Sequence, residues 1–417
     1  MDFTTWIENY STSSTAYIFE PMPDQRFGSA VDKTSSTVKT GARIQPNGDV
    51  LFRIYAPTAQ SVEVQFPQIS AKMMYEEYDY DPEYLVAHAQ PWMGLPEYTL
   101  TLEKSGDFFE GILKYSKVVA SRRSFHVYID GVQMVEPHMP VSFSGDRFGN
   151  FLELPDPGFE DILIQDVPHG SVTADIYWSA VMNRWVRQLV YTPPGYRQVT
   201  DTYPVVYLHQ GRSDTETAWV HSGKVPEIMD NLIAQGKAVP AIIVMNNGML
   251  RTPEDGTEKY DGFIEMICRD SIPYVEANYR CKTDKWHRGI AGLSMGGMQA
   301  CQGGLTHPEL FSSLGLFSCS IRMRDVELDF GKSRHLDLLR DEPEKAEQEY
   351  KLIYRGNGIG EIVRDPVVLE DEEWIRKHGV DQLRCYKRTV FRENCGEHEW
   401  STFRRCFHDY MQLAFQE

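Results

Sequence analysis

The pentapeptide Gly292–Gly296, of sequence GLSMG, most constrains what this chain can fold into. It fits the pattern G-x-S-x-G. A run that ends on small and apolar residues, His287–Ala291, precedes it, and Met295–Cys301 is typical of a helix start. A strand that turns sharply into a helix at Ser294 holds the hydroxyl exposed, and the glycines allow the turn. An ordinary serine in a Gly-rich turn gives the same bare match. The context predicts a strand–turn–helix unit with Ser294 as a candidate nucleophile.

The length of the chain and its first hydrophobic pattern indicate a separate N-terminal domain. At 417 residues the chain exceeds the usual size of a single core, so two domains are expected. From about residue 48 to about residue 155, apolar and polar residues alternate in short runs such as Val50–Tyr55 and Ser61–Phe66, with a turn signal at Asn47-Gly48. This alternation is typical of an antiparallel, immunoglobulin-like β-sandwich.

A different pattern follows the linker-like stretch Pro155–Gly158. Continuous apolar runs such as Val205–Leu208 and Ala241–Met245 suit parallel strands buried on both faces, and helical patterns alternate with them. Together with the strand–turn–helix unit, this pattern predicts the α/β class. We therefore predict an N-terminal extension over residues 1–45, the β-sandwich over 46–157 and an α/β-hydrolase domain over 158–417.

One segment interrupts the rhythm of the sandwich. Between Lys72 and Tyr98, five tyrosines and one tryptophan stand among acidic residues. Such rings could stack on the faces of sugars or phenolic rings, but aromatic residues in a packed surface insertion give the same pattern. Both interpretations stay open.

Composition limits the partners that this chain can take. The 60 acidic and 42 basic side chains give a net charge of −18, which repels nucleic acid and anionic membranes, so neither is an expected partner. The N-terminus lacks a basic region before an apolar core, and no long apolar run occurs, so a cytoplasmic location is expected. Seven cysteines without a C-x-x-C pair or a metal-like cluster predict reduced thiols, and no metal or cofactor is expected.

A nucleophilic serine needs a base, and His398 is the best candidate. A serine alone is a poor nucleophile, and in α/β-hydrolases the chain order is serine, acid, histidine. His398 stands in a Gly-containing loop after the strand-like run Arg384–Phe391 and before a helix that opens near Ser401. His307 follows the serine too closely, at the end of a helix. We predict His398 as the base, against the alternative of a solvated loop histidine.

The acid that orients the base is predicted in the loop after the strand-like run Lys351–Tyr354. Glu361 is the first candidate and Asp365 the second. Lys351–Tyr354 is typical of the strand before the acid, and Gly356–Glu361 is typical of the loop at its end. Either residue could instead be an exposed loop carboxylate.

Two backbone amides are the candidate donors for the oxyanion. The predicted strand Val205–Leu208 runs into His209-Gln210-Gly211, so that the N–H of Arg212 can approach the site, and the N–H of Met295 is the second donor. His209 precedes the serine and ends a strand, so a structural role is expected for it rather than that of the base.

Several motifs, in order, resemble those of one family: the esterase D-like group of carbohydrate esterase family one, which includes feruloyl and acetyl-xylan esterases. The resemblance covers about residues 165–417. It depends on Val190–Tyr196, Glu216–Trp219, Ile228–Ala234, Gly292–Gly297 and Gly396–Trp400. The preceding sandwich is similar to the glycogen-binding-type early-set module, through Phe52–Pro57 and Val127–Gly131.

The resemblance carries further implications, and the chain departs from it at two positions. Trp219 and Trp400 lie in the family motifs and are candidate substrate-binding residues. Gln210 stands where the family usually has the histidine of a His-Gly pair, which leaves the backbone donor intact but puts its geometry in question. Glu361 stands where an aspartate is common, which keeps a carboxylate with a longer reach.

The resemblance implies a serine carboxylic-ester hydrolase that acts on feruloyl or acetyl esters of plant-derived carbohydrates. Its partner would be a small-molecule or oligosaccharide ester, and the oligomeric state stays open. Two alternatives remain. A ferric siderophore esterase of the enterobactin type also joins a leading β-domain to this kind of hydrolase, and a non-catalytic carbohydrate-binding protein would keep the fold without turnover.

Overall fold

The computed structural model divides the chain into two compact units, the first ending at Gln165 and the second beginning at Asp166. The boundary predicted from the sequence, at 157/158, lies a few residues earlier in the same connection. The described residues are 41–66, 98–114, 121–136, 139–144, 147–212, 214–251, 258–259, 262–322, 334–364, 366–391 and 398–416. Within these ranges, no helix is long and apolar enough to cross a membrane.

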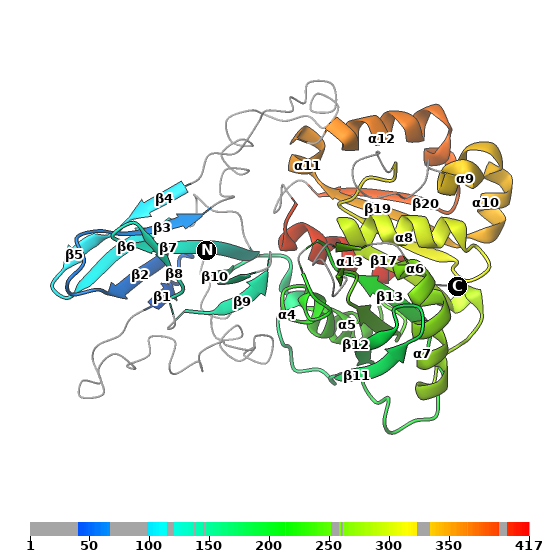
Figure 1. The fold of residues 1–417 in the computed structure, drawn as a ribbon, viewed down its shortest axis with the longest axis horizontal. Helices are drawn as coiled ribbons and strands as arrows, with labels where there is room; N and C mark the ends of the chain where they lie inside the picture. The colour runs from blue at the N-terminus through cyan, green and yellow to red at the C-terminus, as the bar shows by residue number, and fades with distance from the viewer. Residues whose placement is uncertain are drawn as a thin grey trace. The chain divides into compact units, whose positions relative to one another are not determined.

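The first unit is a sandwich of antiparallel sheets (Figure 1). One sheet has the order β1-β2-β6-β5, and the other has the order β4-β3-β7-β10-β9, with β8 paired to β7. The strands are β1 Gly41–Ile44, β2 Val50–Tyr55, β3 Val62–Phe66, β4 Tyr98–Thr101, β5 Glu103–Ser105, β6 Phe108–Leu113, β7 Ser121–Ile129, β8 Val132–Met134, β9 Val141–Ser144 and β10 Arg147–Leu154. The prediction of a β-sandwich is confirmed.

The start of the sandwich corrects one predicted boundary. Strand β1 lies inside the stretch predicted as an extension, and it pairs with β2 from Ile44↔Val50 to Gly41↔Arg53. The turn at Asn47-Gly48 joins the two strands, and Gly48 takes the positive φ of 86° that suits glycine. The four residues of this edge strand do not alternate apolar and polar side chains, which is why the sequence pattern missed it.

Alternation along the strands builds the core of the sandwich. In β2, Val50, Phe52 and Ile54 are fully buried, while the residues between them are partly exposed. The ring of Phe52 lies edge-on to the rings of Phe66 and Phe125, with centroids 6.1 and 5.5 Å apart. Facing sheets thus interdigitate aromatic rings, which prefer such edge-to-face contacts.

The second unit is built on one eight-stranded sheet of order β11-β12-β14-β13-β17-β18-β19-β20. Strands β11, β12 and β14 pair antiparallel, and every other neighbouring pair is parallel. The strands are β11 Ser171–Ser179, β12 Arg184–Thr192, β13 Val205–His209, β14 Ile242–Asn246, β17 Arg288–Leu293, β18 Ser313–Phe317, β19 Leu352–Gly358 and β20 Tyr386–Phe391. The strand order reverses at β13, which makes the carboxyl ends of β13 and β17 the expected place for a ligand.

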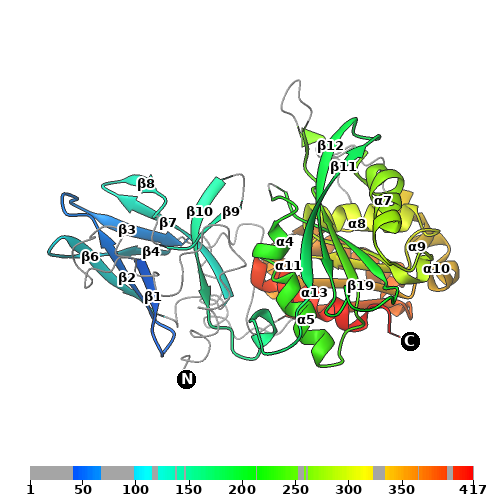
Figure 2. The same cartoon turned by 90° about the horizontal axis from the view of Figure 1, so that it is seen from below.

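Helices cover both faces of this sheet. α8 packs on β13, β17 and β18, whereas α13 packs on β18, β19, β20 and on α5, and Figure 2 shows α8 and α13 on opposite faces. The described helices of four residues or more are α4 Ala218–His221, α5 Val225–Ala234, α6 Phe263–Met266, α7 Ile272–Asn278, α8 Met295–Thr306, α9 Asp337–Asp341, α10 Pro343–Glu349, α11 Ile359–Arg364, α12 Pro366–Lys377 and α13 Trp400–Leu413. A π-helical turn, Ile267–Ser271, joins α6 to α7, and a short hairpin pairs β15 Leu250–Arg251 with β16 Glu258–Lys259.

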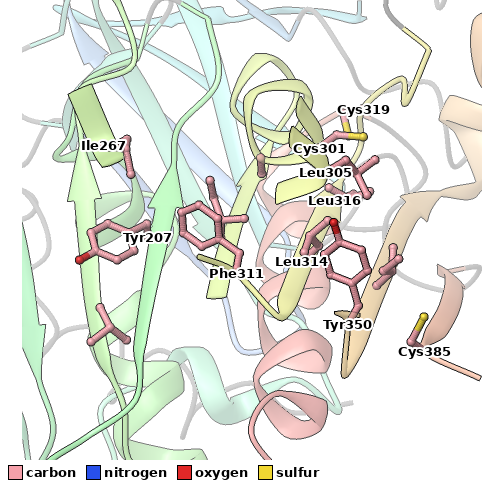
Figure 3. Packing of buried hydrophobic residues seen from close by; sticks show 14 of the residues in the cluster. Tyr207, Ile267, Cys301, Leu305, Phe311, Leu314, Leu316, Cys319, Tyr350 and Cys385 are labelled. Carbon is pink, nitrogen blue, oxygen red and sulfur yellow. The ribbon is translucent and has the colours of Figure 1, made fainter. Parts of the chain in front are cut away.

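The core of the second unit lies between α8 and the sheet (Figure 3). Phe311, Leu314 and Leu305 are buried there, and Tyr207 meets Phe311 edge-on at 6.4 Å. α8 approaches the strands closely, because a Cβ atom on Gly304 would lie 2.6 Å from Leu314. This packing holds α8, which begins directly after the serine, against the sheet.

Candidate active site

The backbone around Ser294 forms the predicted strand–turn–helix unit. Ser294 stands between the end of β17 and the first residue of α8, and it takes φ 53° and ψ −121°, which is unusual for a residue other than glycine. A Cβ on Gly292 would lie 2.5 Å from the carbonyl carbon of Gly296, and a Cβ on Gly296 would lie 2.4 Å from the oxygen of Gln210. The glycines are therefore required for close approach, while the serine itself takes the strained conformation with positive φ.

The structure brings the predicted acid and base together. His398 Nδ1 lies 2.7 Å from Glu361 Oε1. The carboxylate is buried, with 4% of its side chain exposed, whereas 43% of the imidazole is exposed. When Nδ1–H donates to the buried carboxylate, Nε2 keeps its lone pair for a proton from another group. This is the arrangement that a general base needs.

The second oxygen of Glu361 is held as well. Oε2 accepts the hydroxyl of Ser318 and the backbone N–H of Gly358, both at 2.8 Å. Ser318 was not singled out from the sequence. Ser318 directly follows a buried apolar strand, as Ser294 does. This position in the sequence could have been used to predict a role for Ser318 at the site.

The site residues share one edge of the sheet. Four consecutive strands of the sheet, β17, β18, β19 and β20, are each followed by one residue of the site. In the same order, these residues are Ser294, Ser318, Glu361 and His398. Ser294 is also tied to the next strand, since its N–H donates to Phe317 O at 2.9 Å. Parallel strands lie about 4.8 Å apart, so residues that follow consecutive carboxyl ends are neighbours in space. The predicted residues thus assemble where the fold expects a ligand.

The loop after β13 lies against the serine. A Cβ on Gly211 would lie 3.5 Å from Ser294 Cβ, so the backbone of Gly211-Arg212 passes beside the nucleophile. Met295 is the first residue of α8, where N–H groups point away from the helix without an intrahelical partner. This placement is consistent with the amides of Arg212 and Met295 as oxyanion donors, which remains a prediction.

The side chain of Gln210 fixes the loop after β13 through two hydrogen bonds. With its amide in the orientation that satisfies both ends, its nitrogen donates to Asn246 O at 2.6 Å and its oxygen accepts from Gly248 N at 2.8 Å. Asn247, in the loop after β14, donates to Glu216 Oε2 at 3.1 Å, and Glu216 pairs with Arg187. A glutamine in place of the family's usual histidine therefore ties the loop after β13 to the loop after β14.

His209 has the structural role predicted for it. Its side chain is fully buried, its ring meets Phe263 edge-on at 4.8 Å, and neither ring nitrogen has a hydrogen-bond partner among the described residues. Burial lowers the pKa of His209 to about 3, so the imidazole stays neutral near pH 7. The imidazole of His209 lies in the core rather than at the edge of the sheet that carries Ser294 and His398.

The structure corrects the prediction that two tryptophans bind substrate. Trp219 and Trp400 are 1% and 6% exposed, and they meet edge-to-face at 5.4 Å. Trp219 Nε1 donates to the carbonyl of His209 at 2.8 Å. These rings leave almost no surface for a ligand, because they form the core beneath the loops of the site. The motifs that contain them support the site instead.

Two other predictions concern the second candidate for the acid and the binding of a metal ion. Asp365, the second candidate for the acid, lies outside the described residues. In the part of the chain that the structure describes, no group of three or more histidine, cysteine or acidic side chains is arranged to hold a metal ion.

Fold and site together define a class of protein: an α/β-hydrolase in which a strand–turn–helix serine, a buried carboxylate and a paired histidine share one edge of the sheet. The chain belongs to the esterase family, because the family model described as "Putative esterase" matches residues 179–411, just over half of its length.

Two curated relatives are similar to this chain. An endo-1,4-β-xylanase/feruloyl esterase of Xylanibacter ruminicola is 31% identical over 303 residues, which cover 70% of this chain and 38% of that protein. An endo-1,4-β-xylanase Y of Acetivibrio thermocellus is 29% identical over 120 residues, which cover 26% of this chain and 11% of that protein. The chain thus spans well under half the length of both curated relatives.

A further likeness concerns the fold alone. The enterobactin esterase of Shigella flexneri matches with a TM-score of 0.55 at 15% identity, over 87% of this chain and 92% of that one. A CE1 ferulic acid esterase of Anaeromyces mucronatus matches with a TM-score of 0.50 at 22% identity, over 60% of this chain and 93% of that one.

Proposed function

We propose that this chain is a serine carboxylic-ester hydrolase with Ser294 as nucleophile, His398 as base and Glu361 as the acid that orients the base. The observation that carries the proposal is the 2.7 Å contact between His398 Nδ1 and the buried Glu361, at the same edge of the sheet as the strained Ser294. Strained backbone at a polar residue is typical of a functional site. Membership of the esterase family supports the same reaction.

The geometry suits acyl transfer in two half-reactions. Ser294 Oγ attacks the ester carbonyl carbon while Nε2 of His398 takes the hydroxyl proton, and Glu361 stabilises the imidazolium. The amides of Arg212 and Met295 hold the oxyanion. The tetrahedral intermediate collapses, the C–O bond breaks, and the leaving alcohol takes the proton from His398. Water then attacks the acyl-serine with the same base and releases the carboxylic acid.

Feruloyl esters of plant-derived carbohydrates are the substrates that we propose, with acetyl esters next. The support is the 31% identity with a protein named a xylanase/feruloyl esterase. The β-sandwich would then contribute carbohydrate contacts. The ring-rich stretch that suggested such contacts, Lys72 to Tyr98, lies outside the described residues except for Tyr98.

A ferric siderophore ester is the second candidate substrate. A likeness in fold that extends over 87% of the chain, and so beyond the hydrolase unit, favours it. The net charge of −18 opposes it, since an anionic iron complex is repelled by an acidic protein. A non-catalytic carbohydrate-binding protein is disfavoured by the paired His398 and Glu361, because binding alone does not need a buried carboxylate to orient an imidazole.

Rates on three substrates test these alternatives: methyl ferulate, acetylated xylan and a ferric siderophore of the enterobactin type. We expect methyl ferulate to be hydrolysed and Ser294→Ala to lower kcat by about 10⁴-fold or more, because the triad acts as a unit. Ser320→Ala is the matched control and should keep the wild-type rate. Turnover of the siderophore alone would select the second candidate. Glycan binding without any turnover, or a wild-type rate in Ser294→Ala, would refute the proposal.

A further inference from the structure

We infer that Ser318 is a positioning residue for the acid of this site. Its hydroxyl fixes Oε2 of Glu361, so that Oε1 is the oxygen presented to His398. The inference rests on the proposed function, because it assigns a task within the same site. It adds a fourth side chain to the serine, acid and base.

The backbone of Ser318 is held in an unusual conformation. Ser318 directly follows β18 and takes φ 48°, and Ser294 directly follows the neighbouring strand β17 and takes φ 53°. Residues other than glycine rarely adopt this left-handed region, and they keep it only where the surroundings enforce it. Here the N–H of Ser318 donates to the carbonyl of Gly356 on β19 at 2.8 Å. The chain thus stays paired with β19 at this residue, and the hydroxyl reaches the carboxylate that follows that strand.

A glutamate needs such a contact more than an aspartate does. Its side chain has one more methylene group, hence one more torsion whose freedom must be lost before the carboxylate can orient an imidazole. Three donors divide the two oxygens of Glu361: Ser318 Oγ and Gly358 N–H both bind Oε2 at 2.8 Å, and His398 Nδ1 binds Oε1 at 2.7 Å. Without the hydroxyl, one backbone donor remains to hold Oε2, and the carboxylate can rotate away from His398.

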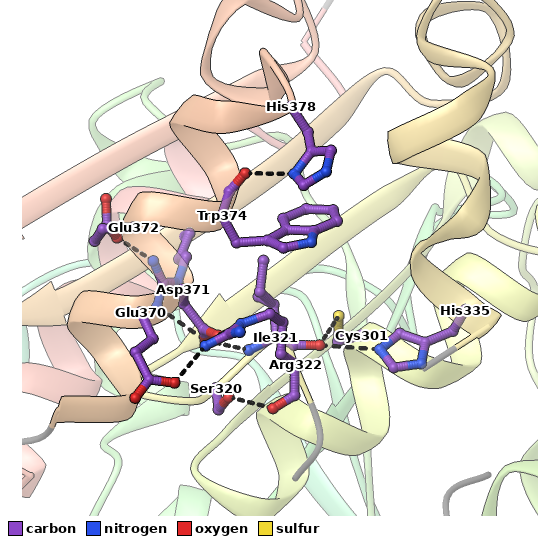
Figure 4. Close-up of polar contacts among 11 residues, drawn as sticks. Cys301, Ser320, Ile321, Arg322, His335, Glu370, Asp371, Glu372, Trp374 and His378 are labelled. Carbon is purple, nitrogen blue, oxygen red and sulfur yellow. Dashed lines mark hydrogen bonds and ion pairs between the residues drawn. The ribbon is translucent and has the colours of Figure 1, made fainter. Parts of the chain in front are cut away.

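The segment after Ser318 is itself clamped, as Figure 4 shows. Asp371 of α12 is fully buried and accepts the N–H of Ile321 at 2.7 Å and Nε of Arg322 at 2.9 Å. On the other side, Nε2 of His335 lies 2.9 Å from the carbonyl of Ile321 and donates to it. These contacts fix the chain three residues beyond Ser318. The hydroxyl is therefore held in place by the fold before any substrate binds.

A double-mutant cycle tests the inference with kcat and KM on methyl ferulate. We expect Ser318→Ala to lower kcat roughly 5- to 50-fold with KM unchanged, which is the effect of losing one hydrogen bond to a charged group. In the background of Glu361→Ala, the same substitution should have no further effect, because Ser318 acts only through Glu361. Ser320→Ala is the control, since its hydroxyl donates to the carbonyl of Arg322 at 2.7 Å and not to the acid.

Ser318→Gly separates positioning from folding. Glycine suits the left-handed backbone, so this variant should unfold at the wild-type temperature or above, yet it should lose as much kcat as Ser318→Ala. Wild-type kcat in both variants, while Glu361→Ala is impaired, would overturn the inference. An equal loss in the Glu361→Ala background would also overturn it. Wild-type kcat in Glu361→Ala itself would instead refute the proposed site.

Discussion

Strands in the two units of this protein bury their side chains in different ways. In the sandwich, β2 and β3 alternate buried and partly exposed residues along their whole length. In the hydrolase unit, β13, β14, β17 and β18 are buried at every position. An antiparallel sheet in a two-layer sandwich has one face on the core, whereas helices cover both faces of a parallel sheet.

This difference explains where the chemistry lies. A strand buried on both faces offers no exposed side chain along its length, so its first accessible residues come where it ends. Every candidate site residue follows β13, β17, β18, β19 or β20. The carboxyl ends of these strands are held in place by a close-packed, rigid core. None of the candidate site residues follows a described strand of the sandwich. The predictions below test this division, beginning with the largest effect.

Loss of the base should damage the rate as much as loss of the nucleophile. We expect His398→Ala to lower kcat by about 10⁴-fold or more, and Glu361→Ala to lower it less, because the carboxylate only orients and stabilises the imidazolium. Asp365→Ala should stay near the wild-type rate. Steady-state rates on methyl ferulate with the three purified variants measure these effects. An impaired Asp365→Ala beside a normal Glu361→Ala would move the acid to the second candidate.

Core substitutions should separate the two units by stability. Phe52→Ala in the sandwich removes a fully buried ring and should cost about 3–5 kcal/mol, whereas Leu314→Ala under α8 should cost about 2–5 kcal/mol. If each unit has its own core, each substitution lowers only its own thermal transition, and only Leu314→Ala shortens the lifetime of esterase activity on heating. Calorimetry with a parallel activity assay measures both. A single shared transition that falls equally in both variants would contradict the division.

The sequence predicted the strand ends well, because β13 and β14 contain continuous apolar runs that stop at polar or glycine-containing loops, and β17, β19 and β20 also end at such loops. Ser294, Glu361 and His398 were predicted from that position and from their order in the chain. The edge strand β1 was missed, since its sequence, Gly41–Ile44, does not alternate apolar and polar residues.

Residues whose roles depend on contacts far apart in the sequence could not be predicted. Ser318 is 43 residues from Glu361 and carries no motif of its own. Trp219 and Trp400 were predicted as substrate contacts because they stand in motifs beside the site, but sequence position does not tell whether a ring faces the pocket or the core. Burial against the partner ring decided it.

A smaller effect concerns His209, which ends β13 but lies inside the core. Burial lowers its folded-state pKa to about 3, below the unfolded value of about 6.5, so the unfolded chain binds the proton first. Its contribution to stability is thus present at pH 7 and is lost as the pH falls from about 6.5 toward 3. Between pH 7 and pH 5 the loss is about 2 kcal/mol.

Replacing His209 by leucine should remove that pH dependence. We expect His209→Leu to lose about 2 kcal/mol less than the wild type between pH 7 and pH 5, whatever its absolute stability, as measured by urea unfolding. Ser294→Ala is the control and should keep the wild-type slope. Equal slopes in His209→Leu and the wild type would show that the imidazole is protonated, or solvated, within the folded protein.

The smallest expected effect tests the division from the side of the sandwich. Because no candidate site residue lies before residue 166, a chain that begins at Asp166 should keep kcat/KM on p-nitrophenyl acetate within about threefold, provided that its circular dichroism and thermal transition show it to be folded. On feruloylated oligosaccharides kcat/KM should fall further, since remote contacts add binding energy only for substrates that reach them. An equal loss on both substrates by a folded truncation would show that the sandwich supports the hydrolase structurally, and that the ends of the buried strands do not suffice for the chemistry.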